Sequence, residues 1–466
     1  MTLPSDDALR ALAAGGTVLS YVALCAATWR AHRAREARVA RAAAALAPAA
    51  EGAQPVLVAH ASQTGNAEQI AWQTAQALHT AGVPARIASL AELLAGDLAA
   101  AERALFIVST YGEGDPPDAA APFVRRVMAQ AAETSLALDG LHCAVLALGD
   151  REYQHYCGFG RTLDAWLRRQ GAQAMFERID VDGGDALALQ QWQHEVARLA
   201  GTSDLPDWQL AAPFEPWRLA HRRLLNPGSV GGPCFHLELE APAGAAMRPD
   251  WQAGDLVQVL PPGDGERPRE YSIASLPADG RVHLLVRQER HADGTPGLAS
   301  GWLTERAAVG DEIALRLRAH GNFRLGDNAG RPLILIGNGT GLAGLRAHLK
   351  ARAAAGHGAN WLVFGERHAA HDAYYRDEIA AWQAGGVLER VDLVFSRDAP
   401  GKRYVQDRLR EQADMLRDWI ARGAALYICG SLVGMASGVE AALVDVLGRD
   451  GVDRLIETGR LRRDVY

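Results

Sequence analysis

Several features that define particular classes of protein are missing from this sequence of 466 residues. Its five cysteines are scattered and form no CxxC pair, which argues against a disulfide framework and a zinc site, so no metal is predicted. The formal net charge is −7, which does not suggest the basic surface expected for nucleic-acid binding. Internal repeats and long low-complexity tracts are also missing. The hydrophobic content of 48% is that of a globular protein, long enough for about three domains.

Charge is missing from one long run near the N-terminus, the 19 residues Ala11–Trp29. As a helix this run would measure about 28 Å, close to the hydrocarbon thickness of a bilayer. Acidic residues precede it and arginines from Arg30 onward follow it, which places its C-terminal side in the cytoplasm. We therefore predict a single-pass transmembrane anchor over 11–29, with a buried helix as the alternative, and a stalk and linker over 30–53.

Beyond the linker, the spacing of apolar residues predicts three further regions. Short apolar runs alternate with helical stretches over 54–202, which predicts a doubly wound parallel sheet with ligands at the carboxyl ends of its strands. A proline-punctuated linker spans 203–215. Shorter, alternating strands over 216–328 predict an antiparallel barrel, and the α/β rhythm returns over 329–466. The predicted fold is thus a multidomain α/β chain.

Three loops at predicted strand ends of the first α/β region combine small, polar and aromatic residues. The first, SQTGN, opens a helix and offers hydroxyls and backbone N–H groups to a phosphate. The other two each bring a tyrosine beside glycine, so the set suits a flat ring with a phosphate tail, although each loop alone also fits an ordinary strand–helix turn. The residues concerned are Ser62, Gln63, Thr64, Gly65, Asn66, Tyr111, Gly112, Gly114, Leu148, Gly149, Asp150 and Tyr153.

The predicted barrel carries two further patterns that suit a phosphorylated ring. In REYSIAS, Arg269 suits a pyrophosphate, Tyr271 a ring face and the Ser272 hydroxyl a ring nitrogen. In GLASGWL, Gly297 and Ser300 form a turn that opens a helix, which is a second phosphate cradle. An exposed strand and a capped helix are the alternatives.

A glycine-rich loop, GNGTG, lies between a predicted strand and helix in the last region, with Gly337, Gly339, Thr340 and Gly341. An NAD site would usually have an acidic residue about 20 positions later, but no Asp or Glu occurs from Leu342 to Gly365. A later strand is instead followed by side chains that suit the 2′-phosphate of NADPH, with an exposed basic turn as the alternative. They are Ser396, Arg397, Lys402 and Tyr404.

Taken together, these motifs over 54–466 resemble the diflavin reductase family, in which a flavodoxin domain is fused to a ferredoxin–NADP reductase domain. The chain is similar to the flavoprotein subunit of sulfite reductase and to NADPH–haemoprotein reductases. The resemblance implies FMN at the first three loops and FAD at the two barrel motifs. It implies NADPH at GNGTG and at SRD and KxYVQ, the second of which includes Gln406.

The resemblance also implies roles for residues that pattern alone leaves unexplained. It places Cys429, Ser272 and Asp464 near the nicotinamide, where they position the hydride, and it places the terminal Tyr466 over the flavin ring of FAD. This chain departs from the family where Asn338 replaces Pro, Gly344-Leu345 replace Pro-Phe, and Ser431 replaces Asp. The long helical insert that connects the flavin domains of the family is reduced to 263–268.

The function expected from this resemblance is that of a membrane-anchored enzyme that passes electrons from NADPH to FAD, to FMN and to an external acceptor, which is expected to be a haemoprotein. Residues 54–202 contain 17 acidic residues, 10 arginines and no lysine, which suits docking of a basic redox partner and equally suits an ordinary solvated face. The flavin domains are expected to face the cytoplasm. Two alternatives remain, an NADPH-dependent reductase of ferric complexes and a non-catalytic, flavin-bound redox-sensing or scaffold subunit.

Overall fold

The computed structural model describes residues 54–130, 136–151, 153–202, 212–242, 249–263, 267–291, 293–399 and 401–466. The predicted anchor over 11–29 and the stalk over 30–53 lie outside these ranges. Among the described residues, no helix combines the length and the apolar character needed to cross a bilayer.

The first sheet is entirely parallel and has the strand order β2-β1-β3-β4-β5, with β6 also paired to β4, as predicted for a doubly wound domain. Its strands are β1 (Val56–Ala61), β2 (Ala85–Ser89), β3 (Arg103–Ser109), β4 (His142–Gly149), β5 (Gln173–Ala174) and β6 (Ile179–Asp182). Its helices are α2 (Asn66–Thr80), α3 (Ala95–Ala100), α4 (Ala121–Phe123), α5 (Gly158–Arg169) and α6 (Ala186–Ala200).

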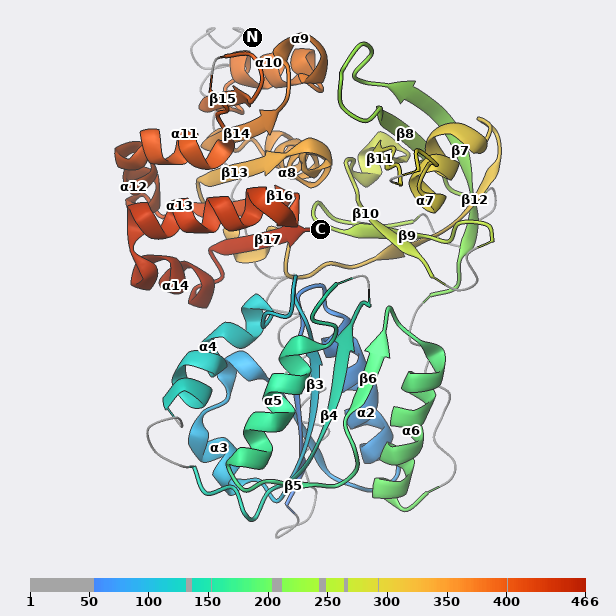
Figure 1. Ribbon diagram of the computed structural model, residues 1–466, viewed down its shortest axis with the longest axis vertical. Helices are drawn as coiled ribbons and strands as arrows, with labels where there is room; N and C mark the ends of the chain where they lie inside the picture. The colour runs from blue at the N-terminus through green and yellow to red at the C-terminus, as the bar shows by residue number, and fades with distance from the viewer. Residues whose placement is uncertain are drawn as a thin grey trace, which may run out of the picture.

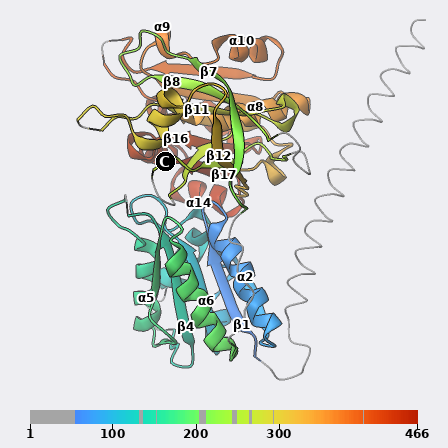
Figure 2. The same cartoon turned by 90° about the vertical axis from the view of Figure 1, so that its right-hand side faces the viewer.

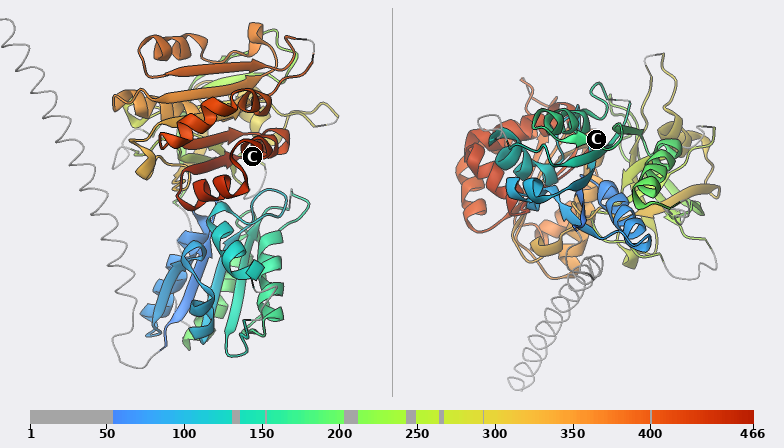
Figure 3. Two further views of the ribbon diagram at one scale, coloured as in Figure 1. Left: turned by 90° about the vertical axis from the view of Figure 1, so that its left-hand side faces the viewer. Right: turned by 90° about the horizontal axis from the view of Figure 1, so that it is seen from below.

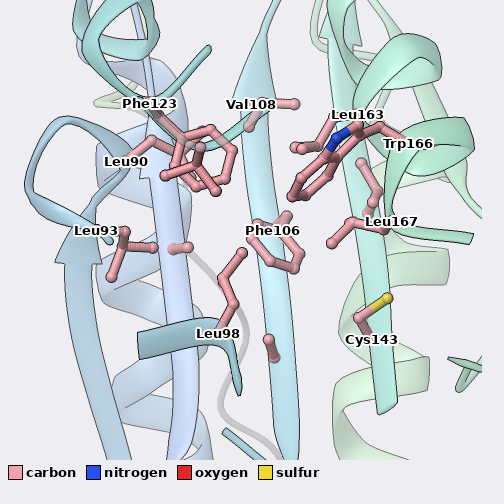
Figure 4. Packing of buried hydrophobic residues seen from close by; sticks show 14 of the residues in the cluster. Leu90, Leu93, Leu98, Phe106, Val108, Phe123, Cys143, Leu163, Trp166 and Leu167 are labelled. Atoms are coloured by element: carbon pink, nitrogen blue, oxygen red, sulfur yellow. The ribbon is translucent and has the colours of Figure 1, made fainter. Parts of the chain in front are cut away.

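Both faces of this sheet are covered by helices, which explains why its strands read as continuous apolar runs. Along β3, Phe106 and Val108 join a core beneath α3, α4 and α5, where Figure 4 shows them facing Trp166. The intervening residues, Leu105 and Ile107, join the second core beneath α2 and α6. Because successive side chains of a strand point to opposite faces, one apolar run serves two cores.

The second sheet is antiparallel, with the order β10-β9-β12-β7-β8-β11. A single bridge between Ile273 and Leu284 joins the two end strands, so the sheet closes into the predicted barrel. Its strands are β7 (Glu215–Leu224), β8 (Cys234–Glu240), β9 (Leu256–Val259), β10 (Arg269–Ser272), β11 (Val282–Arg287) and β12 (Glu312–Arg318), and the short helix α7 spans Leu298–Gly301.

The third sheet is parallel and has the order β15-β14-β13-β16-β17. Its strands are β13 (Leu333–Asn338), β14 (Asn360–Glu366), β15 (Arg390–Phe395), β16 (Ala425–Gly430) and β17 (Leu461–Val465). Its helices are α8 (Leu342–Ala354), α9 (Ala369–Asp372), α10 (Arg376–Ala384), α11 (Val405–Glu411), α12 (Ala413–Ala421), α13 (Ser437–Leu447) and α14 (Arg449–Glu457). The chain therefore ends in a paired strand, and the last residues are held by the sheet.

The carboxyl-end loops of the first sheet face the other two domains (Figures 1 and 2). Viewed from below, the first domain lies across both the barrel and the third sheet (Figure 3). Arg125 pairs with Asp453 and Glu457 of α14, and Arg267 beside the barrel pairs with Asp182. The C-terminus lies at this three-way junction (Figure 1).

Candidate functional site

The SQTGN turn is closed by its own first side chain. Ser62 Oγ accepts hydrogen bonds from the backbone nitrogens of Gly65 and Ala67, at 2.9 and 3.3 Å. Gly65 has a φ of 89°, a left-handed conformation that favours glycine. Arg318 of β12 donates to Thr64 Oγ1 at 2.6 Å, and burial lowers the pKa of that guanidinium to about 10. Arg318 also pairs with Glu270, so its charge is already partly compensated, and its second guanidinium nitrogen lies beside the turn predicted to bind a phosphate.

The two aromatic loops meet beside this turn. A Cβ atom at Gly114, where φ is 117°, would lie 2.7 Å from the Cβ of His155, so the two loops approach too closely for a larger residue. Thr110 Oγ1 and Tyr111 Oη are buried and have no hydrogen-bond partner among the described residues. Burial raises the pKa of the Tyr111 phenol, so it remains a donor. Unpaired polar atoms beside a tyrosine ring fit a ligand with a polar ring edge, as predicted for FMN.

The remaining residues of these loops support the turns that carry the aromatics. A Cβ atom at Gly149 would lie 2.7 Å from the backbone nitrogen of Cys157. The backbone nitrogen of Tyr153 donates to the Asp150 oxygen at 3.2 Å. Gly112 has a φ of 53°, and a Cβ atom there would meet the side chain of Leu432 from the third domain.

Ser272, Cys429 and Asp464, which pattern alone does not connect, come together from three strands. Ser272 Oγ at the end of β10 donates to Asp464 Oδ2 at 2.7 Å, and Cys429 Sγ of β16 donates to the same oxygen at 3.5 Å. Cys429 and Asp464 are register partners in the β16–β17 ladder. Burial, followed by the charge of Asp464, raises the pKa of the Cys429 thiol well above its usual value. The sulfur therefore acts as a hydrogen-bond donor and not as a thiolate nucleophile.

His320 was not identified from the sequence, although it lies between this carboxylate and the first domain. The imidazole is fully buried, with Nδ1 3.9 Å from Asp464 Oδ1 and Nε2 3.3 Å from the Gln63 carbonyl oxygen. Burial lowers its pKa, so the ring is neutral at pH 7. Asn322, two residues later, donates to the carbonyl oxygens of Ser62 and Gln63 at 2.5 and 2.7 Å. No spacing rule connects residues that lie about 260 positions apart.

The two faces of the terminal strand β17 contact different domains. Asp464 points toward Ser272, while its neighbour Arg463 points toward the first domain and pairs with Asp118, where Nε lies 3.1 Å from Oδ2. The Arg463 guanidinium also lies 5.5 Å from the centre of the Tyr111 ring. Gln63 Nε2 donates to the Arg463 carbonyl oxygen at 3.2 Å. Strand alternation thus brings the end of the chain into contact with two of the predicted flavin sites.

Tyr466 continues the β17 ladder beyond its last assigned residue. Its backbone nitrogen donates to the Gly430 oxygen at 3.1 Å, and its own oxygen accepts from Leu432 at 2.8 Å. The phenol oxygen lies 3.0 Å from Thr340 Oγ1 in the GNGTG loop, and half of the side chain is exposed. The predicted position over a flavin ring stays a prediction.

Two of the departures in the GNGTG region contact each other. Asn338 Oδ1 accepts a hydrogen bond from the Ser431 backbone nitrogen at 2.9 Å, so the residue in place of proline ties down the residue in place of aspartate. The glycines are sterically required, since a Cβ atom at Gly337 or Gly341 would lie 2.6 or 2.0 Å from the Cys429 oxygen. Gly339 has a φ of 56°. Gly337 and Gly341 are thus required for close packing against β16, and their contact with a pyrophosphate stays a prediction.

The predicted 2′-phosphate group lies beyond the ends of β14 and β15. The backbone nitrogens of Ser396 and Arg397 donate to the Glu366 and Arg367 oxygens, at 2.8 and 3.0 Å. The side chains of Arg397, Lys402 and Tyr404 are exposed. Neither cation is paired with a carboxylate in the part of the chain that the structure describes, so both are available to an anion.

Other predicted site residues lie on the barrel and on α11. On β10, Arg269 donates to the Arg267 oxygen at 3.2 Å, and Tyr271 is partly buried against the barrel core. Ser300 Oγ accepts from the Glu289 backbone nitrogen at 3.1 Å, and a Cβ atom at Gly297 would lie 2.9 Å from that hydroxyl. Gln406 lies in α11, and its Oε1 is buried without a partner among the described residues. Their cofactor contacts stay predictions.

Both α/β domains match families of known proteins. The flavodoxin family matches residues 58–193, and the oxidoreductase NAD-binding domain family matches residues 335–441. The sulfite reductase [NADPH] flavoprotein alpha-component of Neisseria meningitidis serogroup B is 30% identical, over 90% of this chain and 91% of the relative. Proteins of the same name from Yersinia enterocolitica and Thiocapsa roseopersicina are 29% and 32% identical, over 90% and 85% of this chain and 91% and 84% of the relatives. The Neisseria alignment extends over 551 positions, more than the 466 residues of this chain, so that relative has segments that are missing here.

Proposed function

Because the chain belongs to the diflavin reductase family, with the flavoprotein alpha-components of sulfite reductase as relatives, we propose that it delivers electrons from NADPH to an external haemoprotein. It is an NADPH-dependent oxidoreductase that uses FMN and FAD. When bound, FAD supplies acceptance of a hydride and FMN supplies release of single electrons. The observation that carries the proposal is that β17 contacts two domains. One face of this strand contacts Ser272 of the barrel, and the other contacts Asp118 of the flavodoxin-like domain.

Two groups of residues position the proposed cofactor sites. The Ser272 hydroxyl and the Cys429 thiol both donate to Asp464, so the three groups hold one another at the place proposed for the nicotinamide. Asp464 is positioned to stabilise positive charge that develops there during hydride transfer. His320 and Asn322 hold the SQTGN turn against the barrel, which brings the proposed FMN phosphate site beside the FAD domain.

Delivery to an outside acceptor requires this contact to open. Tyr111 lies under Arg463, and Gly112 lies against Leu432, so in this structure the third domain covers the loop proposed to contact the FMN ring. The flavodoxin-like domain is joined to the barrel through the connection between α6 and β7, so the separation must occur there. The acidic composition of the flavodoxin-like domain favours a basic partner, because charge complementarity mainly raises the association rate.

Two flavins are expected in equal amounts. Protein purified with its native flavins and then boiled should release about one FMN for each FAD, since the two phosphate-binding regions lie in different domains. Chromatography of the released flavins measures this ratio. FAD alone would contradict the function proposed for Ser62–Asn66.

Acceptor choice separates the proposed function from its two alternatives. With NADPH, the flavin-loaded protein should reduce a basic haemoprotein faster than ferric citrate, followed by haem and ferrous-iron absorbance. Faster reduction of ferric citrate would favour the ferric-complex reductase. Failure of NADPH to bleach either flavin would favour a non-catalytic subunit.

NADPH selectivity is expected to depend on Arg397. Replacing Arg397 with alanine should remove a charge-assisted contact worth roughly 1.5–3 kcal/mol and raise the KM for NADPH by about tenfold or more. The KM for NADH should hardly change, because NADH lacks the 2′-phosphate. Arg376→Ala, at the start of α10, is a control outside the proposed site. The KM values are measured by steady-state kinetics with both nucleotides. An equal increase in the KM for NADPH and for NADH would refute the assignment.

Membrane attachment is proposed from the charge-free run 11–29 alone. The full-length chain should sediment with membranes and require detergent for release, while a chain that starts near Gln54 should stay in the supernatant and retain both flavins. Recovery of the full-length chain in the supernatant without detergent would refute the anchor.

A further inference from the structure

Three histidines and one glutamate gather on the outer face of the barrel. His221, Glu238 and His283 are direct cross-strand neighbours on β7, β8 and β11, and His236 lies two residues before Glu238 on the same face of β8. The intervening Leu237 belongs to the barrel core, so the polar row points away from that core.

This face of the barrel is directed at the third domain. Cys234 of β8 and Leu285 of β11 pack into the same hydrophobic cluster as residues of β13 and α8. His236 Nδ1 lies 2.7 Å from the phenol oxygen of Tyr375, immediately before α10. The cluster therefore lies at the contact between the barrel and the third domain, and none of its residues belongs to a flavin or NADPH motif.

The ligand atoms are already close together. His236 Nε2 lies 3.5 Å from Glu238 Oε1, and His221 Nδ1 lies 3.8 Å from the same oxygen. The candidate ligand atoms of His236, Glu238 and His283 all lie within 4.8 Å of one another. In a tetrahedral zinc site, bonds of about 2.0–2.1 Å place neighbouring ligand atoms about 3.3 Å apart. Small side-chain rotations would close the remaining difference.

The imidazoles of His236 and His283 have nitrogen lone pairs that could bind a metal ion. His283 Nδ1 is buried and has no hydrogen-bond partner among the described residues. If His236 donates its Nδ1 proton to Tyr375, its Nε2 lone pair faces the cluster, which is the arrangement that orients histidine ligands in metal sites.

Nearby positive charges are already compensated. Arg281 binds Glu238 through Oε2 at 2.8 Å, which leaves Oε1 on the side of the histidines. Arg346 makes two hydrogen bonds to the carboxylate of Glu378, at 2.6 and 2.9 Å. Neither arginine depends on the lone pairs of His236 or His283.

We propose that His236, Glu238 and His283 bind a divalent transition-metal ion of the zinc class, with His221 or water as a fourth ligand. Imidazole nitrogens with one carboxylate oxygen suit Zn²⁺ and Cu²⁺, whereas Mg²⁺ and Ca²⁺ prefer oxygen ligands. A bound ion would fix the His236 tautomer that donates to Tyr375 and so strengthen the contact between the barrel and the third domain.

Zinc binding tests the proposal directly. Full-length, flavin-loaded protein without a histidine tag, treated with chelator and then dialysed, should bind one Zn²⁺ in calorimetric titration and gain thermal stability. His283→Asn and His236→Asn should each weaken this binding by at least about tenfold. His142→Asn, an exposed histidine of the flavodoxin-like domain, should leave it unchanged. Unaltered flavin content would show that the variants fold.

Copper resonance provides a second readout that does not depend on enzyme activity. With one Cu²⁺ added to the oxidised protein, electron paramagnetic resonance should show splitting from at least two nitrogens and lose one nitrogen in His283→Asn. Absence of a stoichiometric zinc-binding event, or binding and nitrogen splitting unchanged in both His283→Asn and His236→Asn, would overturn the site.

Discussion

Asp464→Asn is expected to slow the reduction of the bound flavins by NADPH about 10²-fold or more, with unchanged flavin content. The carboxylate is the shared acceptor for Ser272 Oγ and Cys429 Sγ, and it supplies the negative charge of that group. An asparagine amide keeps the size of the side chain and loses the charge. Stopped-flow loss of flavin absorbance after mixing with NADPH measures the rate.

A matched control separates this effect from a general loss of charge. Asp450→Asn removes an exposed carboxylate from α14 of the same domain and should leave the rate unchanged. Ser272→Ala, which removes one donor and keeps the carboxylate, should give a smaller loss than Asp464→Asn. A wild-type rate in Asp464→Asn would show that this carboxylate takes no part in hydride transfer.

Arg463→Glu is expected to slow electron passage between the two flavins at least about tenfold, while reduction of the first flavin by NADPH stays near the wild-type rate. The guanidinium is largely buried, pairs with Asp118 and Glu440, and covers Tyr111. Breaking a buried pair by changing one partner typically costs about 3–5 kcal/mol, here in the docking of the flavodoxin-like domain. Biphasic stopped-flow kinetics separates the two steps, and small-angle scattering should show a larger particle.

Reversing both charges of the Arg463–Asp118 pair tests whether this pair holds the domains together. Adding Asp118→Arg to Arg463→Glu should restore much of the lost rate and the compact scattering profile, since the two charges again attract. Restoration should be incomplete because Glu440 faces the new glutamate. Arg454→Glu, exposed on α14, serves as the control. A double variant no better than Arg463→Glu alone would show that this pair does not hold the domains together.

Local patterns were sufficient to predict the sheets and their order in the chain. Buried parallel strands such as β3 read as continuous apolar runs, and the barrel strands alternate, so each type of sheet leaves its own period in a short window. Glycine positions were equally local, since Gly65 and Gly339 have the positive φ that their turns require. The anchor over 11–29 lies outside the described residues and stays a prediction.

Contacts between domains could not be predicted in the same way. His320, Asn322 and Arg463 contact the flavodoxin-like domain across 257 to 345 positions of sequence, and no periodicity extends over such distances. The compensation between Asn338 and Ser431 was also hidden, because each was seen only as a separate departure from the family.

The sequence by itself determined the strands and the phosphate-binding turns, because these depend on the conformational preferences of neighbouring residues. The family motifs could also be read from the sequence, because each lies within a short stretch. Only the tertiary structure decided that Asp464 faces Ser272 while Arg463 faces Asp118, and that His221, Glu238 and His283 form one row. The physical reason is that adjacent strand residues point in opposite directions, and what each one meets depends on strand register and domain docking. Those are set by the burial of whole faces of a sheet, which no short stretch of sequence contains.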